Sequence, residues 1–218
     1  MLPPTVGVRG RGEDGGMEDG GTARMETFSD GVFAIAATLL VLEIGVGSGA
    51  DQHLGRALVD LWPSYLAYAT SFLIIGIIWV NHHECVACMA RVDRTMLFIN
   101  IVLLMVVAFI PFPTKLVADH LQNQGEHAAV YAYDLTLLAM AVLYNIWWRY
   151  ARHGRRLIAE AVPQSKLDAI SRAFAPGIVL YLVVLAVAFV NPLASVILTL
   201  ILAAFYVPAG TLFYRATG

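Results

Sequence analysis

One short stretch of the chain gathers most of the side chains that could do chemistry. Its polar members are Asn81, His82, His83, Glu84, Cys85 and Cys88. Imidazole, carboxylate and thiolate groups are ligands of zinc and other transition metals, so a metal centre is one interpretation. A tetrahedral thiolate site normally needs two cysteine pairs, or one pair with suitably spaced histidines, and only one Cys-x-x-Cys pair is present. We favour a network without metal, in which one of the histidines or Asn81 is hydrogen-bonded to Asp30 or Arg94.

A second polar group stands at the start of the first long apolar run, where Ser29 and Asp30 follow Arg24. An ionisable side chain in a membrane helix marks a functional site by default, because leaving it unpaired is costly. The simpler alternative is that Ser29 and Asp30 only cap the start of the helix. The residue types alone leave both interpretations open.

An apolar stripe follows within the same run. Its members are Ile35, Thr38, Leu39 and Leu42, which share one face of an α-helix because they recur at i, i+3, i+4 and i+7. By itself the pattern is compatible with contact to lipid or with packing in a core. Glu43 ends the run, where it faces either the mouth of an aqueous path or a neighbouring helix or headgroup.

The elements that must position these side chains are apolar helices. Of the 218 residues, 59% are hydrophobic and only 14% are charged, and the mean hydropathy is +0.70. Soluble domains carry roughly 25% charged residues, so these values indicate an integral membrane protein. The net charge of −2 gives no electrostatic support for nucleic-acid binding. Two cysteines exclude a disulfide-rich secreted scaffold.

Six apolar segments are long enough to cross a hydrocarbon layer of about 30 Å as helices. They span residues 28–46, 61–80, 96–117, 130–150, 173–190 and 193–211. The fold class is therefore an all-α membrane protein with six transmembrane helices in a domain over 23–218. We expect the Gly-rich segment 1–22 to be a disordered tail. The turn signal Asn191-Pro192 predicts a tight hairpin between the last two helices.

The distribution of positive charge sets the predicted orientation. Twelve of the 14 Lys and Arg residues fall in the N-terminal segment, in the connections after the second and fourth helices, and at the C-terminus. Only Arg56 and Lys115 fall on the other side. By the positive-inside rule both termini are cytoplasmic, and we expect the protein to lie in the plasma membrane. The two cysteines would then face the cytoplasm and stay reduced.

Several local patterns add smaller expectations. The spacing Ser165–Asp168 looks like a capping box and predicts a short amphipathic helix before the fifth span. Trp147, Trp148 and Tyr150 are typical of an aromatic belt at the membrane interface. Asp134 comes near the outer end of its helix, where we expect it to be solvated. Pro111 should kink or end the third helix.

Motifs of several other function classes are missing from the sequence. It contains no T-V-G-Y-G filter, no G-x-x-x-x-G-K-[ST] phosphate loop, and neither H-E-x-x-H nor G-x-S-x-G. A carbonyl-lined potassium filter of the usual kind, an ATP-driven pump and the common metalloprotease and serine-hydrolase classes are therefore disfavoured. We expect no enzyme activity and no cofactor.

The start of the first helix resembles the signature of the transmembrane protein 175 family of potassium channels, and the match is close to the prokaryotic six-helix members. The matching residues follow the pattern Arg-x-x-x-Phe-Ser-Asp and are Arg24, Phe28, Ser29 and Asp30. A Trp-x-x-His-His pattern over residues 79–83, at the end of the second helix, extends the resemblance. Six spans and cytoplasmic termini agree with it too.

The resemblance implies a homotetramer in which the first helix of each chain lines a central pore for potassium ions, with moderate selectivity. It implies that Ile35 forms the narrowest constriction. Leu39 and Leu42 would form further aliphatic rings, and Thr38 a polar ring beside them. The residues of the implied network that holds this helix in place are Arg24, Phe28, Ser29, Asp30, His82 and His83.

Elementary physics is compatible with such a pore. A ring of aliphatic side chains offers an ion no replacement for its water, so a narrow ring can gate by dewetting, and Glu43 could attract cations nearby. One alternative is a proton-coupled secondary transporter that uses Asp30, His82 and His83 as a relay. Internal repeats and broken midplane helices, which are typical of transporters, are not evident. A membrane metalloenzyme at the histidine–cysteine stretch is the other alternative.

Overall fold

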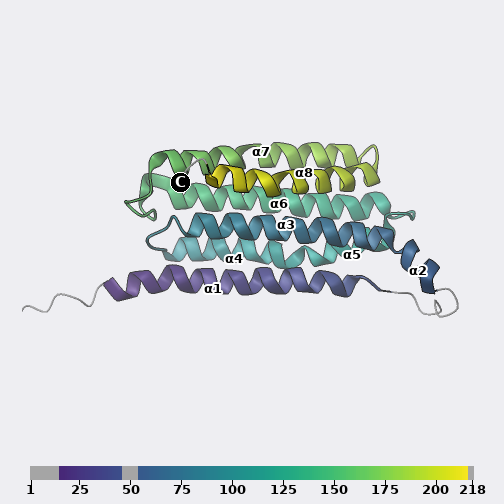
Figure 1. Cartoon of the computed structure of the whole chain (residues 1–218), viewed down its shortest axis with the longest axis horizontal. Coiled ribbons are helices and arrows are strands. Elements are labelled where there is room, and N and C mark those ends of the chain that lie inside the picture. Colours follow the sequence, from purple (N-terminus) through teal and green to yellow (C-terminus); the bar gives the residue numbers. More distant parts are fainter. Residues whose placement is uncertain (1–14, 46–53, 216–218) are drawn as a thin grey trace, which may run out of the picture.

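The computed structural model describes residues 15–45 and 54–215, with side chains for 20–45 and 54–206. The chain forms a bundle of long helices that lie side by side, with α1 along one edge and α7 and α8 along the opposite edge (Figure 1). The elements are α1 (Gly15–Leu39), η1 (Leu40–Glu43), α2 (Leu54–Asp60), α3 (Trp62–Val86), α4 (Arg94–Phe109), α5 (Pro111–His120), α6 (Glu126–Arg152), η3 (His153–Arg155), α7 (Gln164–Ala188) and α8 (Pro192–Arg215).

Among the residues that the structure describes, five segments are long and apolar enough to cross a membrane. They are α1 with η1, α3, the α4–α5 pair, α6 with η3, and α7. The stretch Pro192–Tyr206 of α8 is also apolar but is shorter than a full span. A long apolar helix satisfies its own backbone hydrogen bonds, which lipid cannot do. The protein is therefore an all-helical, multi-pass membrane protein.

The first helix begins and ends at different residues than the apolar pattern predicts. α1 already begins at Gly15, inside the segment expected to be a tail, whose residues 1–14 lie outside the described part of the chain. Met25 is buried against the bundle, so tertiary contact extends the helix beyond its apolar run. The α-helix ends at Leu39 and continues as the 3-10 turn η1. Residues at i and i+3 eclipse in such a turn, which brings Leu42 into line with Leu39.

The start of α7 corrects the capping-box prediction. Pro163 holds the N-cap position in an extended conformation, and no side chain caps the helix there. Ser165 therefore lies inside the first turn of α7, and no separate amphipathic helix precedes this span. Asp168 instead accepts hydrogen bonds from Gln164 (3.1 Å) and from Arg152 (3.2 Å).

Pro111 divides the third span into α4 and α5, because a proline removes a hydrogen bond from the helix interior. A chain of buried hydroxyl groups holds this joint to its neighbours. Tyr133 on α6 donates to Ser71 on α3 (2.9 Å), and Ser71 donates to Thr114 on α5 (2.8 Å). Thr114 in turn donates to the carbonyl of Ile110, beside the break (2.8 Å). Each hydroxyl thus has a partner in an apolar layer.

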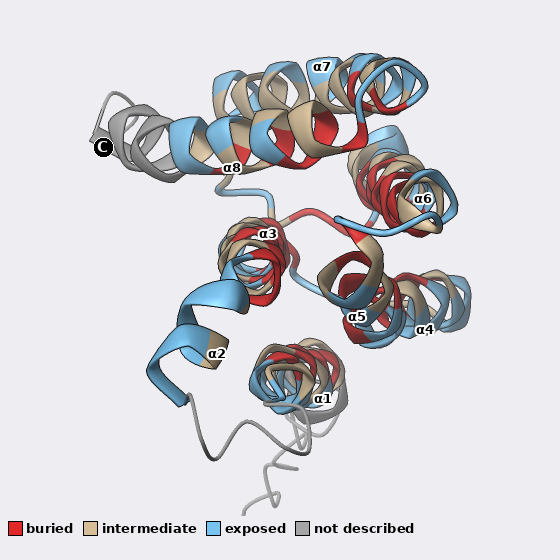
Figure 2. Cartoon of the chain, turned by 90° about the vertical axis from the view of Figure 1, so that its right-hand side faces the viewer, coloured by how far each residue is buried: buried red, intermediate tan, exposed pale blue. Residues whose placement is uncertain are grey.

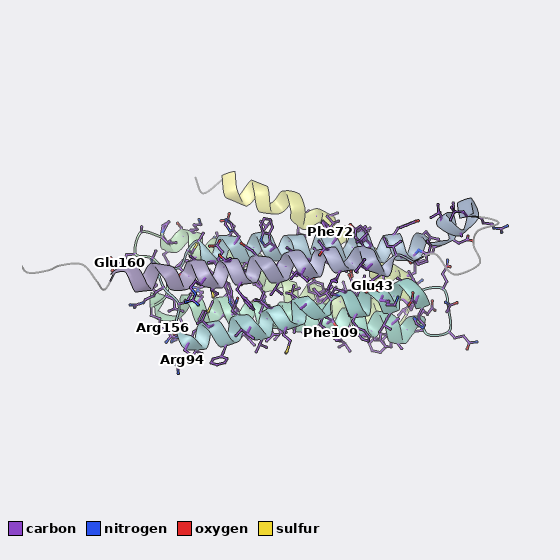
Figure 3. All side chains as sticks on the ribbon, turned by 90° about the horizontal axis from the view of Figure 1, so that it is seen from below. Glu43, Phe72, Arg94, Phe109, Arg156 and Glu160 are labelled. Atoms are coloured by element: carbon purple, nitrogen blue, oxygen red, sulfur yellow. The ribbon has the colours of Figure 1, made fainter. Side chains whose placement is uncertain are left out.

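Two loops close one end of the bundle, which we call the basic end because these loops and the adjoining ends of α4 and α6 carry six of the 12 arginines. The loops meet in an isolated antiparallel bridge between Met89 and Ile158. Its backbone hydrogen bonds run from Ala90 N to Leu157 O (2.9 Å) and from Ala159 N to Cys88 O (3.0 Å). Figure 3 shows Arg94 and Arg156 at the basic end and Glu43 toward the opposite end, which we call the far end.

Asp93 joins α4 to α6 at the basic end. Its carboxylate accepts hydrogen bonds from the backbone N–H of Met96 (2.7 Å) and the hydroxyl of Tyr150 (2.8 Å), and it pairs with Arg156 at 3.8 Å. Arg156 also stacks over the Tyr150 ring at 4.5 Å. Desolvation opposes ionisation, but the hydrogen bonds and the arginine outweigh it and lower the pKa of Asp93.

Two predictions about α6 were wrong. Trp147 and Trp148 are only 0% and 2% exposed, so they belong to the core and not to an interfacial belt. The Trp148 indole donates to Ser171 on α7 (2.9 Å). Asp134 is fully buried instead of solvated, and it accepts a hydrogen bond from Ser195 on α8 (2.7 Å). The rotation of α6 about its axis turns both groups inward, and residue types along one helix do not determine that rotation.

Candidate functional site

The first helix presents two faces with different surroundings (Figure 2). One face is buried in the bundle next to α3 and α4, and its members are Met25, Ser29, Phe33, Ala36 and Leu40. The opposite face is exposed in the single chain. There Ile35, Leu39 and Leu42 are 61%, 41% and 73% exposed. A helix that is apolar on both sides is typical of one that contacts its own bundle on one side and lipid or another chain on the other.

Asn100 on α4 connects the buried face of α1 to three other helices. Its amide nitrogen donates to Ser29 on α1 (3.0 Å), and its amide oxygen accepts from His82 Nε2 on α3 (2.9 Å) and from the Trp147 indole on α6 (3.1 Å). Ser29 passes its own proton to the carbonyl of Met25 (2.8 Å). We call these four side chains, Ser29, His82, Asn100 and Trp147, the Asn100 network.

Aromatic packing fixes His82 within the Asn100 network. Its ring lies 4.8 Å from the ring of Trp147 and 5.5 Å from that of Phe33, measured between centroids. Nε2 donates to Asn100, and the opposite nitrogen Nδ1 has no partner among the described residues. In the neutral imidazole Nδ1 is an acceptor. The network joins side chains of four helices and thereby orients α1 about its axis.

Two contacts at the edge of the Asn100 network hold α1 to α3 from the exposed side. The indole of Trp79 donates to Asp30 (2.8 Å). His83 Nδ1 lies 2.8 Å from a carboxylate oxygen of Glu26. Asp30 and His83 were both predicted as members of the network. Their partners are Trp79 and Glu26 and not the residues expected from the sequence.

The remaining members of the predicted network are not brought into it within one chain. Phe28 is 59% exposed, and Arg24 is exposed and makes no hydrogen bond or ion pair with the described residues. Both lie on the side of α1 that faces away from the bundle.

The histidine–cysteine stretch does not converge on one point. His82 and His83 point to α4 and α1, respectively. Cys85 and Cys88 are free and buried, and Cys88 donates to the carbonyl of Glu84 (3.3 Å). Burial raises the pKa of the Cys88 thiol, which opposes the thiolate that a metal needs. Over residues 20–45 and 54–206, no three potential metal ligands lie together.

The exposed stripe of α1 combines aliphatic and polar groups. Thr38 donates its hydroxyl proton to the carbonyl of Ile35 (2.9 Å), so its oxygen lone pairs remain available to water or an ion. Glu43, at the end of η1, lies 3.4 Å from Lys115 on α5. Of the two alternatives left open for Glu43, this ion pair favours contact with a neighbouring helix.

Sequence reasoning missed Asn100 and Trp147 as members of the network. Asn100 is a polar residue inside a strongly apolar helix, and that contrast was the one available signal, because buried polar groups in a membrane need partners. Trp147 resembled a belt residue by its position next to arginines. Glu26 and Trp79 lie close to recognised polar residues, but only the contact between α1 and α3 pairs them.

Comparison with known proteins places this site in a family. The family model described as the endosomal/lysosomal potassium channel TMEM175 matches residues 24–111. A potassium channel of Chamaesiphon minutus is 42% identical over 196 residues, covering 87% of this chain and 95% of the relative. The chain belongs to the TMEM175 family. A potassium channel of Streptomyces collinus is 44% identical over 176 residues, covering 78% of this chain and 84% of that relative.

The TMEM175 fold is shared as well. The crystal structure of a TMEM175 homologue from Chamaesiphon minutus, described as a lysosomal potassium-selective channel, matches with a TM-score of 0.79 at 40% identity. The match covers 86% of this chain and 97% of that one. TMEM175 is described as an ion channel and not as an enzyme. The resemblance to this family that the residues at 24–30 and 79–83 carry is thus confirmed.

Proposed function

We propose that the protein is a potassium-permeable cation channel, built as a homotetramer in which α1 of each copy lines a central pore. The observation that carries the proposal is the exposed stripe of Ile35, Leu39 and Leu42, which lies opposite the face anchored by the Asn100 network. A helix fixed in rotation on one side presents a constant surface on the other. The relatives from Chamaesiphon and Streptomyces are named potassium channels, and this supports potassium as the permeant ion.

The proposed pore has an aliphatic constriction. Ile35 forms the narrowest ring, and Leu39 and Leu42, aligned through η1, form two more. Such rings give an ion no replacement for its hydration water, so they can close the path by dewetting. Potassium gives up its water more readily than sodium and would be favoured modestly. Thr38 supplies the hydroxyl oxygens beside the constriction.

The proposed placement in the membrane follows from charge. α8 supplies a sixth span, and the basic end faces the cytoplasm of a cell whose plasma membrane holds the channel, with both termini on that side. No bound cofactor is required, since the permeant ion is the only ligand. Arg24 and Phe28, on the outward side of α1, would find their partners in an adjacent subunit.

Ion flux into proteoliposomes tests the proposal. Wild type is compared with Ile35→Asn and with the control Ile201→Asn, which changes an isoleucine of similar exposure (58%) on α8. We expect potassium flux above that of empty vesicles, a lower sodium flux, and a change in rate and selectivity in Ile35→Asn only. Light scattering of the detergent-solubilised protein should give the mass of four chains.

Two outcomes would overturn this proposal. If folded wild type and Ile35→Asn both fail to pass potassium, the pore along α1 is wrong. If potassium moves only when a proton gradient is imposed, and the two fluxes stay in fixed proportion, the protein is the proton-coupled transporter considered as the alternative. A pH-sensitive dye inside the same vesicles distinguishes these outcomes.

A further inference from the structure

A buried carboxyl group joins α6 to the hairpin of α7 and α8, and the proposed pore makes no use of it. Asp134 is fully buried, and its Oδ2 lies 2.7 Å from the hydroxyl oxygen of Ser195 on α8. Its other oxygen, Oδ1, has no partner among the described residues. An ionisable group inside a membrane helix marks a functional site by default, because burying its charge unpaired is costly.

The hydroxyl group of Ser195 has one proton but two neighbouring oxygens that can accept it. Its oxygen lies 2.7 Å from Asp134 Oδ2 and 3.0 Å from the backbone carbonyl oxygen of Val184 on α7. If Asp134 is ionised, this single proton can serve only one of the two oxygens fully. If Asp134 holds a proton on Oδ2, it donates to Ser195, and Ser195 donates to Val184. Both distances then belong to full hydrogen bonds, so the geometry fits the neutral carboxylic acid.

The surroundings of Asp134 supply no positive charge to stabilise its ionised form. α7 and α8 carry no charged side chain over residues 173–206. The titratable groups close to the carboxyl group are the phenols of Tyr133 on α6 and Tyr181 on α7, and Tyr206 on α8 lies beyond Tyr181. The other charged and histidine side chains of α4, α5 and α6 lie nearer the ends of the bundle, and they are Arg94, Lys115, Asp119, His120, Glu126, His127, Arg149 and Arg152.

Asp134 lies closer to the far end of the bundle than to the basic end. At 1.5 Å per residue, the rise along α6 is about 12 Å from Glu126 to Asp134 and about 27 Å from Asp134 to Arg152. On α8, Ser195 lies only about 5 Å along the helix from its first residue, Pro192. The short path for a proton between Asp134 and water is therefore the one at the far end.

The hairpin of α7 and α8 lies along one edge of the bundle (Figure 1), and different polar contacts hold its two ends to α6. At the basic end, Arg152 on α6 is paired with Asp168 on α7 at 3.2 Å. Toward the far end, the polar contact is the one between Asp134 and Ser195. Only 6% of the most apolar window of α7 is buried, so this helix contributes few buried side chains to the attachment. Loss of the contact at Asp134 would therefore loosen the far half of the hairpin and leave the basic end attached.

We propose that Asp134 is a proton-binding site that attaches the hairpin of α7 and α8 to α6. The neutral acid donates to Ser195, and the hairpin is then packed against α6. As the pH rises, the proton passes to water at the far end, and the carboxylate that remains shares one donor with the carbonyl of Val184. The far half of the hairpin then separates from α6 and lets water reach the charge. The site includes no residue of α1, so a failure of the proposed pore would not affect it.

Infrared spectroscopy of the full-length protein in lipid nanodiscs tests whether Asp134 holds a proton. A protonated carboxyl group has a carbonyl band that a carboxylate lacks, and the difference between wild type and Asp134→Asn isolates this group. We expect the band in wild type at about pH 5 and its loss by about pH 9. The matched control Asp119→Asn, at an aspartate of the far end that is paired with Lys115, should keep the band.

Ser195→Ala assigns the same band without changing the carboxyl group. Removing the hydroxyl removes the hydrogen bond to Asp134, so the carbonyl band should move to a higher frequency. The absence of a band for Asp134 at both pH values would show that the group stays ionised and would overturn the proposal. A band of equal strength at both pH values would show that the proton is never released, and that result would overturn it too.

Hydrogen exchange of the same samples tests whether the hairpin moves. Mass spectrometry follows the peptides over residues 184–199 and 167–175, each normalised to the exchange rate of the unfolded peptide at the same pH. From about pH 5 to about pH 9, we expect the protection of 184–199 to fall at least about threefold in wild type and to stay constant in Asp134→Asn. Residues 167–175, at the basic end, should not change in either protein.

The comparison between the two proteins removes the effect of other ionisable groups at the far end. His120 and His127 are present in both, so a change that occurs only in wild type belongs to Asp134. Equal loss of protection in wild type and Asp134→Asn, or no loss in wild type, would overturn the proposal.

Discussion

Two sites in this protein join helices through polar side chains buried in the bundle, and they use different chemical groups. The Asn100 network lies near the basic end and joins α1, α3, α4 and α6 through an amide, an imidazole, an indole and a hydroxyl. The second site joins α6 to α8 through Asp134 and Ser195 alone. Each leaves one polar atom without a partner among the described residues, Nδ1 of His82 in the first and Oδ1 of Asp134 in the second.

The difference lies in what the unpartnered atom costs. An imidazole nitrogen without a partner is a neutral group in an apolar layer, whereas a carboxyl group there must either bear a charge or hold a proton. Ser195 divides its single hydroxyl proton between Asp134 and the carbonyl of Val184 (3.0 Å), so the support for Asp134 is incomplete. The comparison indicates that the Asn100 network raises the free energy of unfolding, whereas the buried carboxyl group of Asp134 lowers it.

The largest expected effect is that of removing the centre of the network. Asn100→Leu has a similar volume but leaves His82 and Trp147 without their acceptor and Ser29 without a donor. We expect a loss of about 3 kcal/mol in the free energy of unfolding, roughly 1 kcal/mol for each contact. Denaturant titration in detergent micelles measures it.

Asn145→Leu is the matched control, because Asn145 donates only to the carbonyl of Ala141 in its own helix (3.0 Å). A loss under about 1 kcal/mol is expected there. Equal losses in the two variants would mean that the Asn100 network contributes no more than any buried amide.

The next largest effect sharpens the contrast between the two sites. Asp134→Asn keeps an oxygen that can accept from Ser195 and removes the ionisable group, so we expect stability to rise by about 1 kcal/mol. The converse change, Asn100→Asp, removes the donor to Ser29 and adds an ionisable group, and should lower stability by about 2 kcal/mol or more. If Asp134→Asn instead lowers stability, the carboxyl group has a structural partner.

A smaller effect is expected at the exposed edge of the Asn100 network. Trp79→Phe removes the hydrogen bond to Asp30, but Trp79 is 43% exposed and water can replace the lost donor. We expect a loss of roughly 0.5 kcal/mol by thermal unfolding. Trp62→Phe, at a tryptophan of similar exposure (38%), is the control and should change stability less.

The smallest effect concerns a carboxylate that, unlike Asp134, is supplied with donors. The pKa of Asp93 is lowered in the folded state, so its contribution to stability is full above the unfolded pKa of about 3.9 and is lost as the pH falls through the lower folded pKa. Asp93→Asn should melt at a temperature slightly below wild type from pH 7 to about pH 5, and the gap should close below about pH 4. A gap that is independent of pH would show that Asp93 acts only as a helix cap.

The apolar composition was sufficient to predict a helical membrane protein, and the residues at 24–30 and 79–83 were sufficient to identify the family. Both predictions depend only on the residue types within short stretches of the sequence. For the polar stretch after Trp79 a hydrogen-bonded network with Asp30 or Arg94 was expected, but in the structure His82 pairs with Asn100 and His83 with Glu26. Whether the stripe of α1 lines a pore stays a prediction until flux is measured.

What the sequence could not provide was the pairing between helices. Ser29 and Trp147 are joined through Asn100 because α4 packs against both α1 and α6, an arrangement set by the packing of whole helices. For the same reason Trp147 was taken for a belt residue and Asp134 for a solvated one. A pattern along one helix gives its apolar face, but a single sequence does not tell which neighbour covers that face.

The bridge between Met89 and Ile158 has a consequence for how the surface of this protein can change over evolutionary time. Its hydrogen bonds are made by backbone atoms of two loops, so they survive most substitutions of the side chains around them. The loops can therefore exchange arginines for other residues without separating the hairpins that they join. A lineage that moves to a membrane of different lipid composition could retune the charge at this end while keeping the bundle intact.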